Sequence, residues 1–280
     1  MKIAIDSFGA LMPDPDGKTL SPTQRLAFLI EEIETQDDAC STRPPVAPRG
    51  LLQVRTSACV RSSSLRAAGG DFAESFLRSD SSLAIAVGDC SGHGAEATVG
   101  AALFRAAIRS LLGGDGDLVS IAARLNRLLY RQAASGSMPW PFVTVFLAVV
   151  DPTTRMLTYL SCGHDAALLF GEDASHTHLL ANAPVLGVSD VDKFTVDAVA
   201  VDRLGALVVA TNGLSDARPL DADVFFGTGG ICAAFLSMRR EIGAGARNAV
   251  DGASRLIESA RRHSDGRLDD DAAAFIAYFE

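Results

Sequence analysis

Hydrophobic residues follow two alternating patterns along most of the chain. Short runs rich in Val, Leu, Ile and Ala predict buried strands over residues 83–89, 142–150, 156–163, 193–201, 205–213 and 272–280. Hydrophobic residues at helical spacing predict helices over residues 95–112 and 117–134, and again roughly over 229–242 and 246–262. Turn signals such as Asp151-Pro152 stand between consecutive strands, which predicts hairpins.

This arrangement of elements favours one fold class. Strands linked by hairpins, with the helices grouped between them, predict an α+β fold in which antiparallel sheets are covered by helices. A parallel sheet would require strands and helices to alternate one by one, and the chain does not follow that pattern.

Residues 1–49 differ from the rest of the chain. They hold six of the eleven prolines. Between the proline clusters, residues 21–36 predict one helix, with Ser21 as its cap and Pro22 in its first turn. A proline-rich linker follows over residues 42–50. We therefore expect an N-terminal arm, residues 1–49, and one domain, residues 50–280; the helix either packs on that domain or serves regulation or homodimer formation.

Composition excludes several classes of protein. The chain has 280 residues, of which 48% are hydrophobic and 21% charged, which is typical of a globular protein with a sizeable core. Its net charge of −9 disfavours nucleic acid and anionic lipid as partners. Mean hydropathy is +0.20, but no stretch approaches the ~20 uncharged apolar residues of a spanning helix. The first residues are interrupted by Asp6 and do not form a secretory signal, so we expect a cytoplasmic protein without membrane insertion.

The cysteines support this assignment. All five stand apart, without a CxxC motif, at Cys40, Cys59, Cys90, Cys162 and Cys232. Without an export signal, such a set predicts reduced thiols. Cys90 and Cys162 are predicted to be small buried side chains.

Acidic residues stand at the ends of several predicted strands. Asp71 lies in GGDF, Asp89 lies in GDCSGHG between a strand and a helix, and residues 269–271 (DDD) precede the final strand. The segment TNG, with Asn212, has the same position but carries an amide. Because Mg²⁺ and Mn²⁺ prefer oxygen ligands, carboxylates gathered at strand ends can bind them. Taken singly, GGDF, DDD and TNG are better explained as turns or solvated loops. GDCSGHG lacks the lysine and the glycine spacing of phosphate-binding loops.

The order of these segments resembles the SpoIIE-like branch of the PPM metal-dependent serine/threonine phosphatases. GGDF, GDCSGHG, FVTVFLAVVDPTTRMLTYLSCGH, PVLGV, LVVATNG and DDDAAAFIAYFE follow one another as the family's GGDFYD, DVSGHG, TxF…AGH, TDG and DD motifs do. The resemblance covers residues 49–280 and leaves out the N-terminal arm. It implies a four-layer α-β-β-α sandwich of two antiparallel sheets flanked by helices.

The resemblance also implies a site with two Mn²⁺ or Mg²⁺ ions. Asp89 would bridge the ions, and the carbonyl of Cys90 would complete one coordination shell. Asp270 would bind the second ion, and Asp71 would reach the ions directly or through water. Asn212 stands where the family has a metal-binding aspartate.

The implied activity is hydrolysis of phosphoserine or phosphothreonine on a protein by a metal-activated water. Asp71, Asp89 and Asp270 would be the catalytic carboxylates. The implied substrate is a phosphorylated regulatory protein, an anti-sigma-factor antagonist. His164 and Gly187 match structural blocks of the family, His93 is expected to shape the metal loop, and Arg61 and Arg66 are surface arginines or ligands of the substrate phosphate.

The chain departs from the family pattern at two places. The Asn212 amide carries no full charge, so we expect weaker binding of the second ion. This departure leaves an alternative open, a pseudophosphatase that binds a phosphoprotein without efficient hydrolysis. Ala73-Glu74 replaces the usual Tyr-Asp, and Glu74 keeps the charge on a longer side chain.

Overall fold

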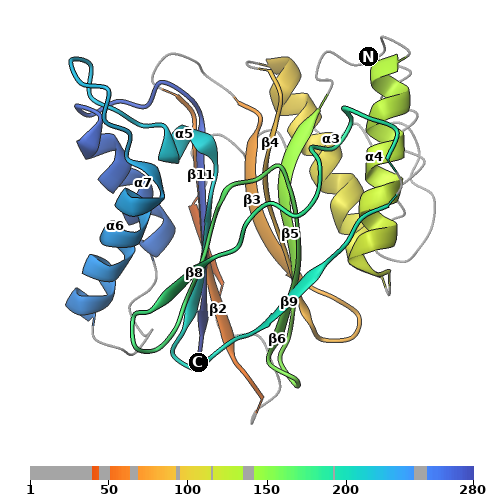
Figure 1. The fold of residues 1–280 in the computed structure, drawn as a ribbon, viewed down its shortest axis with the longest axis horizontal. Helices are drawn as coiled ribbons and strands as arrows, with labels where there is room; N and C mark the ends of the chain where they lie inside the picture. Colours follow the sequence, from red (N-terminus) through yellow and green to blue (C-terminus); the bar gives the residue numbers. More distant parts are fainter. Residues whose placement is uncertain are drawn as a thin grey trace.

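The computed structural model describes residues 40–43, 51–63, 69–92, 95–114, 116–134, 142–191, 193–242 and 251–280. Within these ranges, two antiparallel sheets pack face to face, and helices cover both outer faces (Figure 1). The predicted α-β-β-α sandwich is confirmed.

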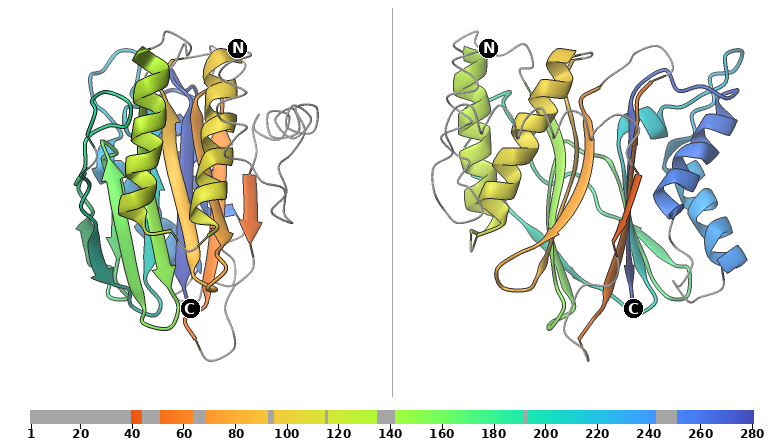
Figure 2. Two further views of the ribbon diagram at one scale, coloured as in Figure 1. Left: turned by 90° about the vertical axis from the view of Figure 1, so that its right-hand side faces the viewer. Right: turned by 180° about the vertical axis from the view of Figure 1, so that it is seen from behind.

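One sheet contains six strands within the described ranges, in the order β1-β2-β11-β10-β7-β8. The strands are β1 (Cys40–Arg43), β2 (Val54–Arg61), β7 (Ala166–Phe170), β8 (His176–His178), β10 (Ala206–Ala210) and β11 (Ala272–Phe279). Helices α6 (Gly227–Ile242) and α7 (Gly252–His263) cover its outer face (Figure 2). The short helix α5 (Asn212–Ser215) follows β10 directly.

The other sheet contains five strands within the described ranges, in the order β3-β4-β5-β6-β9. The strands are β3 (Asp71–Leu77), β4 (Leu83–Cys90), β5 (Val143–Asp151), β6 (Met156–Cys162) and β9 (Asp197–Ala200). Helices α3 (Ala95–Leu112) and α4 (Leu118–Ala134) cover its outer face. Among the helices described, none combines the length and the apolar composition needed to cross a bilayer.

Strand β4 shows how the sequence builds these layers. Ile85 and Val87 belong to the core between the two sheets, whereas Ala84 and Ala86 pack against α3. Side chains of a strand alternate between its two faces. Asp89 continues the series of Ile85 and Val87, so β4 carries this carboxylate to the end of the core between the sheets.

Most predicted helices and strands are confirmed, with local differences. β9 is shorter than predicted, and the strand predicted over 205–213 ends at Ala210, where the chain turns into α5. Thr42 and Arg43, which were predicted to start the linker, belong instead to β1, because they pair with Ser57 and Thr56 of β2. The helix predicted over residues 21–36 lies outside the described residues.

One prediction about the cysteines is wrong. Cys40 and Cys59 are directly opposite in the register of β1 and β2, and their sulfur atoms are bonded. Their separation of 19 residues gives no sign of this pairing until the register of the two strands is known. Cys90, Cys162 and Cys232 are free, and the first two are buried as predicted.

Candidate metal centre

Two carboxylates face each other at one end of the sandwich. Asp71, the first residue of β3, is the cross-strand partner of Asp89 in β4. Directly opposed residues project to the same face of a sheet, so both side chains enter the space between the sheets. Asp71 is only 5% exposed. The pair therefore lies where the hydrophobic core ends, in a poorly solvated position.

Gly70 allows the two strands to approach closely beside these carboxylates. Its carbonyl accepts a hydrogen bond from the Cys90 N–H at 3.1 Å. A Cβ atom on Gly70 would lie 2.2 Å from the Cys90 carbonyl oxygen and 2.8 Å from Asp89 Oδ1. The Cys90 carbonyl and the Asp89 carboxylate therefore border the same small space, which fits their predicted roles in one coordination shell.

Thr211 links this pair to the opposite sheet. Its hydroxyl donates to Asp71 Oδ2 at 2.6 Å and accepts from the Ala273 N–H of β11 at 2.8 Å. Sequence analysis did not single out this residue. Its one signal was its place at the end of a predicted strand, directly before Asn212-Gly213.

The acidic run 269–271 supplies carboxylates from the last strand. Asp271 is 5% exposed, and its Oδ1 accepts the Ser63 N–H at 2.8 Å. Gly69 lies against it, since a Cβ atom there would be 1.7 Å from Asp271 Oδ2. Asp270 is exposed, and its Oδ1 accepts the Asp271 N–H at 3.0 Å. The structure thus adds Asp271, which sequence analysis did not assign to the site.

The pKa values show that these carboxylates interact. Burial, followed by the charge of Asp89, raises the pKa of Asp71 well above its usual range. Burial, followed by the charge of Asp270, raises the pKa of Asp89 to about 6, although a hydrogen bond from the Asp71 carboxyl opposes this rise. Asp271 contributes to the rise at both groups. Carboxylates that raise one another's pKa in this way form a site where a divalent cation is favoured.

The donor types fit Mg²⁺ or Mn²⁺, which prefer carboxylate and carbonyl oxygens. As the side chains stand, no three His, Cys, Asp or Glu residues of the described ranges are arranged to hold a metal ion. Asp71 and Asp89 stand directly opposite each other in the pairing of β3 with β4. A cation bound between them would offset the negative charge by which Asp89 raises the pKa of Asp71.

Asn212 lies at the rim of the acidic group. It is the first residue of α5, its side chain is exposed, and its carbonyl accepts the Asp216 N–H at 2.7 Å. Thr211 before it contacts Asp71, and a Cβ atom on Gly213 after it would lie 1.7 Å from the Asp271 carbonyl oxygen. The structure gives the Asn212 side chain no described contact with the carboxylates.

The remaining candidate residues from the sequence lie beside the acidic group, away from it, or outside the described residues. Arg61 lines a small cavity that Asp71 and Asp271 also line. Glu74 lies on the other face of β3, where it pairs with Arg105 and Arg109 of α3, so it does not extend the acidic group. Arg66 and His93 lie outside the described residues.

His164 and Gly187 have described partners other than the four aspartates of the site. His164 is 4% exposed, and burial lowers its pKa to about 4. The Gly187 N–H donates to Asn126 Oδ1 at 2.8 Å, which ties its loop to α4.

Comparison with known proteins identifies the class. The family model described as Stage II sporulation protein E (SpoIIE) matches residues 79–280. The chain therefore belongs to the SpoIIE family, the SpoIIE-like branch of the PPM phosphatases.

Several known proteins are similar to parts of the chain. Protein IcfG of Synechocystis sp. is 28% identical over 184 residues, which is 57% of this chain and 29% of that protein. The RsbU and RsbW domains of Rv1364c from Mycobacterium tuberculosis share the fold with a TM-score of 0.67 and 24% identity, over 86% of this chain and 62% of that one. The PP2C phosphatase domain of SpoIIE from Bacillus subtilis was solved with a fragment of its regulatory domain. It has a TM-score of 0.64 and 16% identity, over 87% of this chain and 70% of that one.

The chain spans less than a third of IcfG and less than two thirds of the Rv1364c chain. RsbX, solved in complex with magnesium, has the same fold at 16% identity, with a TM-score of 0.59 over 85% of this chain and all of that one.

Proposed function

We propose that the chain is a protein phosphatase that hydrolyses phosphoserine or phosphothreonine with the help of two Mn²⁺ or Mg²⁺ ions. The observation that carries this proposal is the gathering of Asp71, Asp89, Asp270 and Asp271, from three distant segments, into one electrostatic group. Membership of the SpoIIE family and the magnesium in the RsbX structure support it.

Asp71, Asp89, Asp270 and the Cys90 carbonyl are the residues we propose as metal ligands. When bound, divalent cations supply an activated water and offset the charge of the phosphoryl oxygens. Asn212 takes the place of an aspartate ligand and contributes at most a neutral amide oxygen. We therefore expect this chain to need more Mn²⁺ than a family member that carries aspartate there.

The surrounding residues hold these groups in position. The Thr211 hydroxyl fixes one oxygen of Asp71. Gly70 keeps the Cys90 carbonyl beside the Asp89 carboxylate, and Ser63 holds Asp271 from the end of β2. Because these contacts come from both sheets, the position of each carboxylate depends on the packing of the whole sandwich.

For the substrate, we propose a phosphorylated regulatory protein of the anti-sigma-factor antagonist type. Two similarities support this class, one to the RsbU and RsbW domains of Rv1364c and one to SpoIIE. The participation of the N-terminal helix in a homodimer remains a prediction.

The test is Mn²⁺-dependent hydrolysis of p-nitrophenyl phosphate and of a phosphoserine peptide. We expect turnover that EDTA removes, and Asp89→Asn should lower it at least about 100-fold with little change in the circular dichroism spectrum. Asp202→Asn is the matched control, because Asp202 precedes β10 at the opposite end of the sandwich. Turnover that persists in Asp89→Asn would refute the proposal. Absence of turnover at every Mn²⁺ concentration, with phosphoprotein binding retained, would instead indicate the phosphoprotein-binding module that Asn212 raises as an alternative.

A further inference from the structure

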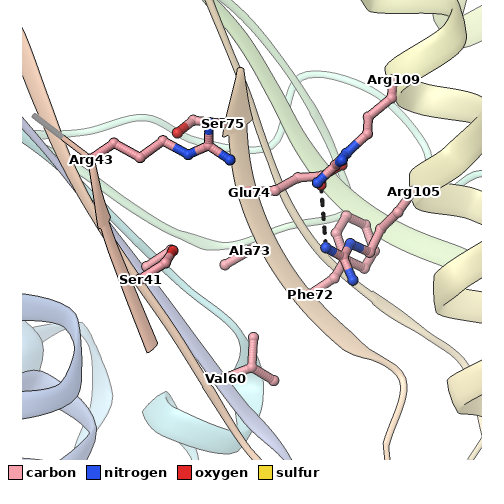
Figure 3. Close-up of a pocket in the computed structure, with 10 residues that line it drawn as sticks. Ser41, Arg43, Val60, Phe72, Ala73, Glu74, Ser75, Arg105 and Arg109 are labelled. Atoms are coloured by element: carbon pink, nitrogen blue, oxygen red, sulfur yellow. Dashed lines mark hydrogen bonds and ion pairs between the residues drawn. The ribbon is translucent and has the colours of Figure 1, made fainter. Parts of the chain in front are cut away.

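The two departures from the family pattern, at Glu74 and at Asn212, have different surroundings. Glu74 Oε2 pairs with Arg109 at 2.7 Å and with Arg105 at 3.4 Å, and both arginines point toward it from α3 (Figure 3). Glu74 is therefore held by partners within the fold. The Asn212 side chain is exposed and has no hydrogen bond or ion pair with any described residue. No contact in the described part of the chain explains an amide at this position.

The residue after Asn212 is glycine. The other three asparagines of the chain precede arginine or alanine, and one of them, Asn248, lies outside the described residues. An asparagine loses its amide when the backbone nitrogen of the next residue attacks the carbon of the side-chain amide. Glycine hinders this attack least, because it has no Cβ atom and its backbone turns freely. Asn212-Gly213 is therefore the pair in this sequence that is most prone to deamidation.

The other two described asparagines are held in place. Asn126 is 2% exposed, and its amide donates to two backbone carbonyls at 2.9 and 2.6 Å. The Asn182 amide donates to Asp197 Oδ2 at 2.9 Å, and its Oδ1 accepts the Ser161 N–H at 2.8 Å. The Ala183 N–H, which would have to attack Asn182, donates to the Ser161 carbonyl at 3.1 Å. These bonds must break before either amide can react.

At Asn212 neither reacting group is held. Among the described residues the Gly213 N–H has no acceptor, as is usual for the first N–H groups of a helix. The attack requires rotation about the Asn212 Cα–C bond. This rotation breaks the hydrogen bonds that the Asn212 carbonyl accepts, from the Asp216 N–H at 2.7 Å and the Ser215 hydroxyl at 3.3 Å. Because α5 has only four residues, such a local opening leaves the rest of the sandwich folded.

The position of Asn212 gives its conversion a consequence. The Thr211 hydroxyl before it donates to Asp71 at 2.6 Å, and Gly213 after it lies against the backbone of Asp271. Gly213 has no room for a Cβ atom there, so packing requires glycine at this place. A carboxylate formed at residue 212 therefore stands at the rim of the acidic group and adds a full negative charge to it.

We propose that Asn212 deamidates in the folded chain without an enzyme, and that the aspartate so formed supplies the charge that the family has at this position. The Gly213 nitrogen loses its proton and bonds to Asn212 Cγ, the bond from Cγ to the side-chain nitrogen breaks, and ammonia leaves. Water then opens the succinimide ring, which gives aspartate or isoaspartate. In sum, one water is consumed and one ammonia is released. This inference rests on the proposed metal centre and adds a slow chemical control of it.

The first measurement follows the full chain during incubation at mildly alkaline pH. Peptide mapping by mass spectrometry measures the loss of the Asn212 amide and distinguishes aspartate from isoaspartate, with Asn182 as the internal control. We expect Asn212 to react at least about tenfold faster than Asn182, which corresponds to a barrier about 1.4 kcal/mol lower. Asn212→Gln is the matched control variant and should keep its amide, because the longer side chain would have to form a larger ring.

The second measurement is calorimetric Mn²⁺ titration of the same samples. We expect the fraction converted to aspartate to bind Mn²⁺ about tenfold more tightly than the starting chain, with the affinity of Asn212→Asp. The isoaspartate fraction should not gain affinity, because its backbone is longer by one carbon and moves Thr211 and Gly213 apart. Asn212→Gln should keep its starting affinity throughout the incubation.

The outcomes separate this inference from the proposed function. An Asn212 amide that survives as long as the Asn182 amide overturns the inference, and so does conversion to aspartate that leaves the Mn²⁺ affinity unchanged. Neither measurement depends on turnover. If p-nitrophenyl phosphate is not hydrolysed even by Asn212→Asp, the proposed function fails, and peptide mapping with calorimetry still decides whether Asn212 is converted and whether the conversion tightens Mn²⁺ binding.

Discussion

Replacing Gly70 by alanine tests whether the close approach of β3 and β4 positions the candidate metal ligands. The new Cβ atom would stand 2.2 Å from the Cys90 carbonyl oxygen and 2.8 Å from Asp89 Oδ1, and real Cβ atoms essentially never come within 3.0 Å of such atoms. The Cys90 oxygen belongs to the backbone, so a side-chain rotation cannot relieve this contact. The two strands must separate by about 1 Å at the Asp71 and Asp89 pair.

Two magnitudes follow from this displacement. Overpacking of this kind costs about 1–3 kcal/mol of unfolding free energy. A displacement of about 1 Å at a reacting centre lowers turnover roughly 100-fold. Mn²⁺ affinity should fall as well, because the Cys90 carbonyl and the Asp89 carboxylate move apart.

The assays are urea denaturation, Mn²⁺ titration calorimetry and hydrolysis of p-nitrophenyl phosphate. Gly229→Ala is the control, since a Cβ atom on Gly229, in helix α6, meets nothing within 4 Å. That variant should gain about 0.5–1 kcal/mol from its better helix propensity and keep its activity. If Gly70→Ala keeps the stability, the Mn²⁺ affinity and the turnover of the wild type, Gly70 is not the residue that positions the site.

Three further predictions concern single side chains. Asn212→Asp should tighten Mn²⁺ binding by restoring a full charge, and an unchanged affinity in calorimetry contradicts the account of this position. Burial lowers the pKa of His164 to about 4, so the unfolded chain takes up this proton first and stability falls by roughly 3 kcal/mol as the pH drops from 6.5 to 4. His164→Gln should lose this component of the pH dependence in urea denaturation, and an unchanged slope argues against it. Thr211→Val removes the hydroxyl that contacts Asp71 and the Ala273 N–H, so it should lower the free energy of unfolding by about 1–3 kcal/mol in urea denaturation. Thr177→Val, on the exposed strand β8, is its control and should change the free energy of unfolding little.

The layers of the fold could be predicted from the sequence because the pattern of hydrophobic residues depends directly on which faces of a strand or helix are buried. The runs that became β4, β5, β6 and β11 are almost continuously apolar, as strands with two covered faces are. Asp71 and Asp89 were found because each interrupts or ends such a run within a glycine-rich motif. Strand alternation also implies that Glu74, three residues after Asp71, faces the other way.

Contacts between distant segments were not predictable in the same way. Three aspartates stand side by side at residues 269–271, and only the packing of the last strand shows that Asp271 is buried while Asp270 is exposed. The hydrogen bond from Thr211 to Asp71 spans 140 residues and joins the two sheets. The pairing of Cys40 with Cys59 likewise depends on the register of β1 against β2.

Glu74 and Asp71 lie on opposite faces of β3 and have different partners, and this contrast supports the proposed site. On the outer face, Glu74 is held by two arginines of α3 at 2.7 and 3.4 Å, so its charge is compensated within the protein. On the inner face, Asp71 meets other carboxylates and one hydroxyl, and burial together with the charge of Asp89 raises its pKa. A divalent cation bound at the proposed metal centre would offset the negative charge that these carboxylates place on one another.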